Sequence, residues 1–227
     1  MDPLFKSLIV QLAPQPLRMP LPPLDRDELQ AIFSEVVKKY PYQALAFTPD
    51  GRGAVFQNSQ EDAIELRPAQ FQMQLKLDCP EPLPAPSAEQ KVKAILEIAT
   101  ERLKIENFLQ CAVQIIAFAP LDGGDPDAKG YVAEHLMHGI DQAAVLDDGY
   151  FAGGVRFRKI QDDNTGEDSL SVEPYLQDNH LVYLDYQRAR VAVHGPIRLE
   201  QLSNWILESF EFLSDPTMKL LSQEGNT

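Results

Sequence analysis

The same order of predicted elements occurs twice along this chain, and this order restricts the folds open to it. Each occurrence contains a strand, a Pro-marked turn, a strand that includes an Asp, a Pro-containing connection and an amphipathic helix. The segments are 64–68, 71–78 and a helix opening at Ser87, then 170–174, 181–185 and a helix opening near Arg198. A recurring unit of this kind predicts a duplicated domain with a pseudo-two-fold axis. Two chance runs of similar pattern are the alternative, because few residues match by identity.

The hydrophobic periods of these segments indicate the fold class. Residues 71–78 alternate strictly between apolar and polar, which is typical of an antiparallel strand with one wet face. Residues 111–118 are apolar on both faces, which indicates a central strand. The helices opening at Ser87 and near Arg198 each carry one apolar stripe. We predict an α+β fold built from an internally duplicated strand–helix–strands–helix unit, with a mostly antiparallel sheet and helices packed on one face.

The length of 227 residues fits one large domain or two small lobes that share a core. The first predicted half covers residues 1–108 and includes a proline-rich connection at 13–24. The second half covers 109–215, and residues 216–227 form a C-terminal tail. We expect the two halves to form one compact pseudo-two-fold unit.

Net charge and cysteine usage narrow the class of protein. The formal net charge of −14 repels phosphate backbones, so the sequence argues against nucleic-acid binding and favours basic protein partners or cations. The chain has 2 cysteines and no run of about 20 apolar residues, so we expect a cytoplasmic protein without a membrane segment. Cys111 opens the apolar run 111–118, which predicts a buried thiol of low reactivity. A homo-oligomer remains open.

Several segments resemble one family of sporadically distributed, uncharacterised bacterial proteins with a two-half α+β plan. The resemblance lies in 64–66 followed by Phe71, in Leu181–Tyr186, and in 199–212 followed by Asp215, Pro216 and Thr217. It implies a bacterial cytosolic protein. It brings no activity, cofactor or catalytic residue with it.

The sharpest candidate for a metal site is the run 134–141. His135 and His138 are three residues apart, so on a helix they project from one face, with Asp141 at its margin. Two imidazoles and a carboxylate could hold a divalent ion. The alternative is a solvated helix face, because the spacing of zinc hydrolases is absent and no third strong ligand is evident.

A second candidate is a basic patch on an otherwise acidic chain. Arg156 and Arg158 lie on one predicted strand of the second half, and Arg188 and Arg190 lie on another. If the strands were adjacent, these residues could bind an acidic ligand or partner. The alternative is that the cations protect a sheet edge from aggregation.

These observations support two hypotheses of function. The first is a non-catalytic cytosolic binding or accessory protein that engages a protein partner, in the setting of a bacterial defence or conflict system. The second is a metal-assisted, hydrolase-type enzyme with a site between the two halves. The sequence shows no nucleophile–base pair, so an enzyme is the less favoured of the two and no cofactor is predicted beyond a divalent metal.

Overall fold

The structure is a computed structural model of the whole chain. It describes residues 2–15, 22–59, 61–78, 81–121, 127–137, 153–161, 163 and 165–222.

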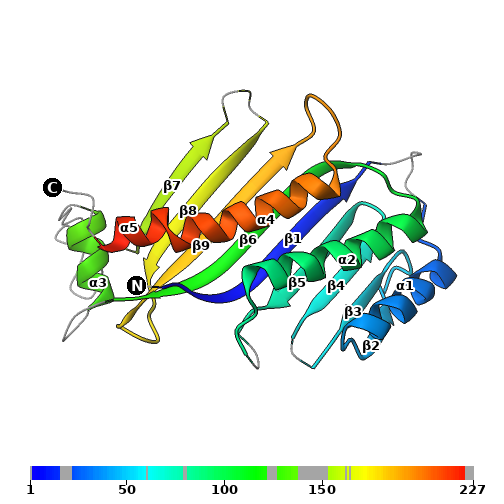
Figure 1. Cartoon of the computed structure of the whole chain (residues 1–227), viewed down its shortest axis with the longest axis horizontal. Coiled ribbons are helices and arrows are strands. Elements are labelled where there is room, and N and C mark those ends of the chain that lie inside the picture. The colour runs from blue at the N-terminus through cyan, green and yellow to red at the C-terminus, as the bar shows by residue number, and fades with distance from the viewer. Residues whose placement is uncertain are drawn as a thin grey trace.

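One antiparallel sheet runs through the entire molecule (Figure 1). Its nine strands lie in the order β2-β3-β4-β5-β1-β6-β9-β8-β7. The strands are β1 (Leu4–Pro14), β2 (Ala44–Phe47), β3 (Ala54–Gln57), β4 (Ala63–Arg67), β5 (Gln70–Lys76), β6 (Phe108–Pro120), β7 (Val155–Ile160), β8 (Gly166–Pro174) and β9 (Leu181–Val191). Because β1 pairs with β6 at the centre, the sheet is continuous across the predicted boundary between the halves.

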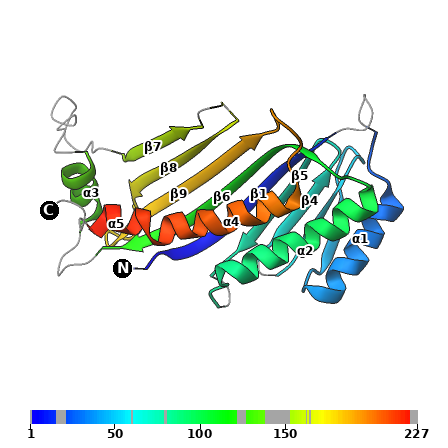
Figure 2. The same ribbon diagram turned by 45° about the horizontal axis from the view of Figure 1, so that its top comes forward.

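The long helices cover one face of this sheet (Figure 2). The helical elements are α1 (Arg26–Lys39), α2 (Ala85–Leu103), α3 (Ala128–Tyr131), the π-helix η1 (Val132–Leu136), α4 (Leu199–Ser214) and α5 (Pro216–Ser222). The core lies between α1, α2, α4 and the sheet. It includes Leu8 and Val10 of β1, Val113 and Ile115 of β6, and Ile95 of α2.

Local sequence explains where several of these helices begin and end. The Asp25 carboxylate caps α1 by accepting the Asp27 N–H at 2.8 Å. The helix α2 begins at Ala85, two residues before the predicted capping residue Ser87. Pro86 is tolerated there, because the first turn of a helix needs no partner for its N–H groups. α2 ends at Lys104, which has a left-handed φ of 54°.

The α+β class, the antiparallel sheet and the helices on one face are confirmed. The internal duplication stays a prediction. On one side of the central pair, the strands beyond β1 are β5, β4 and β3 in spatial order. On the other side, the strands beyond β6 are β9, β8 and β7. The helices α2 and α4 follow β5 and β9 in the chain.

The first residues of the predicted C-terminal tail, 216–222, form the helix α5. Pro216 interrupts the α4 hydrogen-bond pattern after Asp215 and starts this new helix. Thr217, Met218 and Leu221 are buried in the core, and the Tyr131 hydroxyl donates to the Leu221 carbonyl. The apolar spacing of Met218 and Leu221 therefore serves packing.

A buried ion pair fixes the β3–β4 turn to α2. The Lys91 ammonium lies 2.6 Å from the Asp62 carboxylate, and their side chains are 14% and 3% exposed. Asp62 also accepts the backbone N–H of Lys76 at 2.8 Å and the Asn58 amide at 2.9 Å. The turn, β5 and α2 thus converge on one carboxylate.

Asp62→Asn should lower the free energy of unfolding by about 3 kcal/mol, because it leaves the Lys91 ammonium largely buried without its counter-charge. Urea denaturation measures this loss. The matched control is Asp215→Asn, which breaks the exposed pair with Lys219 and should change stability by less than about 1 kcal/mol. Equal effects of the two substitutions would contradict the structural role of Asp62.

Neighbouring leucines of α5 give a second test. Leu221 is 2% exposed and Leu220 is 41% exposed. Leu221→Ala should cost about 2 kcal/mol by removing core contacts, and Leu220→Ala should cost less than about 0.5 kcal/mol. If thermal melts show that the two variants are alike, residues 216–222 do not pack as α5.

Burial raises the pKa of the Cys111 thiol to about 12. In a Cys79→Ser background, Cys111 should therefore resist a thiol reagent such as DTNB at pH 8 while the protein is folded. It should react fully in denaturant, where the thiol regains a pKa of about 8.5. Rapid labelling of the folded variant would show that the Cys111 thiol is accessible.

Candidate functional site

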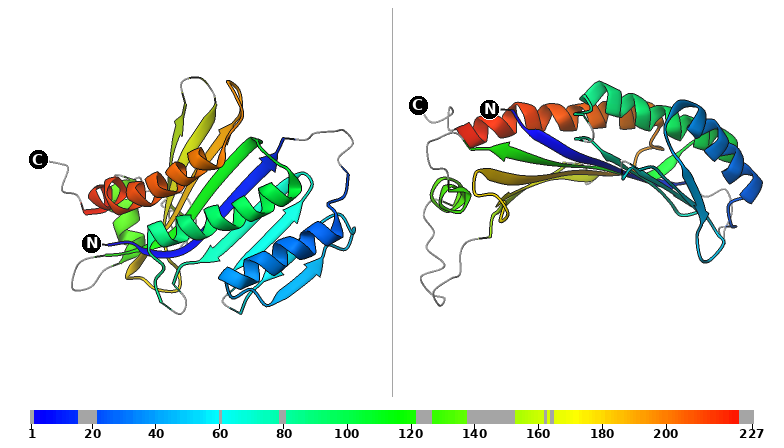
Figure 3. Two further views of the ribbon diagram at one scale, coloured as in Figure 1. Left: turned by 45° about the vertical axis from the view of Figure 1, so that its right-hand side comes forward. Right: turned by 90° about the horizontal axis from the view of Figure 1, so that it is seen from below.

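The sheet has a second face that α1, α2 and α4 do not cover, here called the inner face. Figure 3 (right) shows the sheet arching beneath the helices, so that this face lies on the inside of the arch. On the central strands the inner face is formed by Ser7, Ile9, Gln11 and Ala13 of β1 and by Gln110, Ala112, Gln114, Ile116 and Phe118 of β6. Strand alternation places these side chains opposite the buried core residues.

The composition of the inner face differs from that of an ordinary solvent-exposed sheet face. Ile9, Ala112, Ile116 and Phe118 are half-buried although no described helix crosses them. The polar members are largely neutral amides, and the Gln11 amide donates to the Gln72 side chain at 3.2 Å. Apolar groups beside uncharged donors and acceptors provide a surface that a ligand can cover at low desolvation cost.

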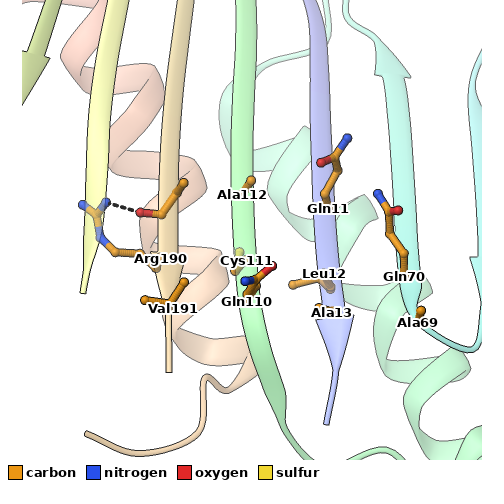
Figure 4. Close-up of a pocket in the computed structure, with 11 residues that line it drawn as sticks. Gln11, Leu12, Ala13, Ala69, Gln70, Gln110, Cys111, Ala112, Arg190 and Val191 are labelled. Carbon is orange, nitrogen blue, oxygen red and sulfur yellow. Dashed lines mark hydrogen bonds between the residues drawn. The ribbon is translucent and has the colours of Figure 1, made fainter. Parts of the chain in front are cut away.

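One end of the inner face contains a pocket of about 370 Å³ (Figure 4). Its floor is made of small side chains from β1, β6 and β9, namely Ala13, Ala112 and Ala189. Gln11, Gln70 and Gln110 stand around it, and Gln70 and Gln110 are exposed. The small residues create the depression, and the glutamines supply hydrogen-bonding groups at its rim.

The other end of the inner face contains a pocket of about 330 Å³ with charged walls. A register shift in the β1–β6 pairing between Phe5 and Ser7 leaves Lys6 as an extra residue. The Lys6 ammonium lies 2.9 Å from the Asp78 carboxylate and 5.3 Å from the centre of the Phe118 ring. The charges here are paired, so this end has little net field.

Aromatic rings continue the surface beyond this second pocket. The Phe118 ring lies 4.3 Å from that of Tyr175 and 6.1 Å from that of Tyr183, measured between centroids. Burial raises the pKa of the Tyr183 phenol, and the nearby carboxylates of Asp185 and Glu173 add to the effect. The Tyr183 hydroxyl is therefore a neutral group at physiological pH.

The four predicted arginines do not form one patch, because the sheet separates them. In register, Arg158 lies opposite Ser169, which lies opposite Gln187 on the inner face. Arg188 lies opposite Asp168 on the helix side, and its guanidinium donates to Glu208 of α4. β8 also intervenes between β7 and β9, a spacing that the sequence does not reveal.

Three of the four arginines are also paired with carboxylates on their own side of the sheet. Arg158 donates to both carboxylate oxygens of Glu167, at 2.7 and 2.6 Å. Arg190 lies 2.7 Å from Asp168, and its guanidinium lies 5.9 Å from the centre of the Trp205 ring. Arg156 makes a 3.3 Å hydrogen bond to the Ser169 hydroxyl. An anion site built from all four residues is therefore not assembled.

The predicted metal site is not tested by the structure. His138 and Asp141 lie outside the described residues, and so does the side chain of His135. Across the described part of the chain, no group of three or more His, Cys, Asp or Glu side chains is arranged to hold a metal ion. The run 134–141 therefore stays a prediction.

The inner face was not predicted from the sequence, although one sequence feature, the apolar run 111–118, indicated it. The run 111–118 is apolar on both faces, which we interpret from sequence as a central strand buried on both sides. β6 is central, yet among the described residues helices cover only one of its faces. The excess apolar character of Ile116 and Phe118 is the signal that could have indicated a binding surface.

No helix in the described residues has both the length and the apolar character needed to cross a membrane. No protein-family model matches the chain, and neither does any curated protein. A solved structure of the rolling circle replication initiator protein from Geobacillus stearothermophilus is similar at 12% identity, over 91% of this chain and 79% of that one. Its TM-score of 0.31 is too low to carry an argument about fold or function.

Proposed function

We propose that this chain is a non-catalytic binding protein of the bacterial cytosol whose inner face holds a segment of a protein partner. The observation that carries the proposal is the double-sided apolar character of β6. Ile115 and Val113 point into the core, while Ile116, Ala112 and Phe118 remain half-buried on the uncovered side. Half-buried apolar side chains at the centre of a face, with pockets at both of its ends, are typical of an interaction surface.

The chemistry of the inner face favours a polypeptide as the ligand. Glutamine amides both donate and accept hydrogen bonds, so they match the alternating N–H and C=O groups of an extended backbone. The alanine-floored pocket and the Phe118 end can each receive a side chain. Nucleic acid fits poorly, since the Lys6 and Lys76 ammonium groups are paired with Asp78 and Glu61.

The distance between the two pockets indicates the size of the bound segment. They lie near Gln110 and Phe118 of β6. Eight residues of strand separate these positions, which corresponds to about 27 Å. An extended partner segment of about eight residues would span them. The place of such a partner in a bacterial defence or conflict system is part of the proposal, and it rests on analogy with acidic, sporadically distributed bacterial proteins.

Substitution of the pocket rim should abolish partner binding. Gln70 and Gln110 are exposed, so the double variant Gln70→Arg/Gln110→Arg should fold normally while two long cations obstruct the alanine-floored pocket. Affinity purification of the tagged chain from its native host, followed by mass spectrometry, should recover a partner with the native sequence. Recovery with the variant should fall at least about tenfold.

The matched control is Gln30→Arg/Gln90→Arg, which makes the same chemical change at exposed positions of α1 and α2. This control should recover the partner as well as the native chain does. Equal recovery by both double variants, or a chain that is always purified alone, would contradict the proposed role of the inner face.

A further inference from the structure

The strand β7 presents an open edge of the sheet. The sheet order ends at β7, and no strand within the described ranges pairs with its outer side. Gln161 donates its N–H to the Gly166 carbonyl at 2.9 Å. Because the backbone groups of an antiparallel strand alternate in direction, the N–H and C=O groups of residues 155, 157 and 159 also point toward β8. The backbone N–H and C=O groups of Arg156, Arg158 and Ile160 therefore point outward and are available to another strand.

This edge strand exposes two large apolar side chains beside its cations. Phe157 is 40% exposed and Ile160 is 60% exposed. Soluble proteins seldom leave large apolar side chains on an open edge, because the edge then pairs with other chains. Two such side chains on a six-residue strand indicate a surface that is covered in use.

A pocket of about 230 Å³ lies beside Phe157 on the helix side of the sheet. Its apolar walls come from Phe157, Leu170, Tyr186 and Phe212. The rings of Tyr186 and Phe212 are 4.7 Å apart, which fixes the side of the pocket nearest α4. The pocket is large enough for one aliphatic or aromatic side chain of a strand added at β7.

The charge of β7 is opposite to that of the chain as a whole. The strand carries Arg156, Arg158 and Lys159 and no acid, whereas the chain has a formal net charge of −14. Because Arg158 is paired with Glu167 of β8, the positive charge that a partner meets comes from Arg156 and Lys159. No ion pair of Lys159 is found among the described residues, although it stands opposite Asp168 in the register. Such a strand attracts acidic segments and orients them before contact.

A second copy of the chain is a poor occupant of this edge. Pairing of β7 with β7 around a two-fold axis would place Arg156, Arg158 and Lys159 against the same cations. Like charges on directly paired strands are destabilising. The same cations favour a partner strand that carries Asp or Glu.

We propose that β7 is a docking edge for an acidic, extended segment of a partner protein, which adds as another strand and inserts one apolar side chain beside Phe157. Backbone hydrogen bonds to Arg156, Arg158 and Ile160 supply affinity. Phe157 and Lys159 lie on the same face of β7, so the pocket and Lys159 select an apolar residue with an acid two positions from it. This site lies on a different edge and face from the alanine-floored pocket, so it does not depend on the function proposed above.

The test uses a peptide of alternating sequence, Thr-Glu-Thr-Phe-Thr-Glu-Thr-Val-amide with fluorescein at its N-terminus, titrated with the full chain by fluorescence anisotropy. Its two Glu residues stand two positions from the Phe, so they share the face of the Phe in an added strand. Micromolar binding that weakens with salt is expected, and the same peptide with Lys in place of its acids should not bind. Two N-methylated versions of the peptide test the backbone hydrogen bonds. One is methylated at its odd-numbered residues and the other at its even-numbered residues. Only one version should abolish binding, because alternate N–H groups of an added strand face β7.

Variants locate the site. Lys159→Glu and Phe157→Ala should each weaken binding at least about tenfold. The control Lys38→Glu makes the same charge change, and Leu176→Ala truncates another large exposed apolar side chain; both positions lie away from β7, so both variants should leave binding unchanged. Gln70→Arg/Gln110→Arg should also bind the peptide normally, which separates this proposal from the inner face.

Three results would overturn the proposal. The first is no binding at about 1 mM peptide. The second is loss of binding with both N-methylated versions or with neither. The third is self-association of the chain that Lys159→Glu abolishes, since it would assign the edge to a second copy.

Discussion

The pairing of β1 with β6 is the constraint on which the rest of the structure depends. These strands are about a hundred residues apart in sequence, yet they pair over ten positions of register, with Leu8 opposite Ile115 and Val10 opposite Val113. Every other strand is added outward from this pair, and α2 and α4 pack on the same side of the sheet. Because side chains alternate along a strand, this pairing also decides which residues of the two central strands face away from the helices.

The binding surfaces follow from that arrangement. The helices satisfy the apolar residues on one face of the sheet, and the same strands present Ile9, Ile116 and Phe118 on the other. Charge is arranged around the centre of that face, where Lys6 is paired with Asp78 and the Gln114 amide donates to Asp185 at 2.9 Å. At the far edge, β7 combines exposed apolar groups with cations. The molecule therefore presents two chemically distinct surfaces, one neutral and one cationic, and we propose that each binds a polypeptide.

Elements with a strong local signal could be predicted from the sequence. The alternation in 71–78 gave β5, and apolar stripes gave α1, α2 and α4. The strand order could not be predicted, because it depends on long-range pairing that leaves no local pattern. This is why the sequence left open whether Arg156 and Arg158 lie beside Arg188 and Arg190, whereas in the structure β8 intervenes and the arginines divide between two faces. The inner face was missed for a similar reason, since whether a helix covers Ile116 depends on tertiary packing. The helix at 216–222 was not predicted from the sequence, because Pro216 ends one helix and starts another.

The central claim is that the inner face contacts a protein, and site-specific cross-linking tests it most directly. A photoreactive benzoylphenylalanine would be placed at Gln110 on the inner face, or at the equally exposed Gln90 on α2, in the native host. After irradiation, the adducts would be identified by mass spectrometry. The account predicts one defined protein, attached through one short segment, at position 110 and none at position 90. No adduct at position 110, or the same mixture of adducts at both positions, would contradict it.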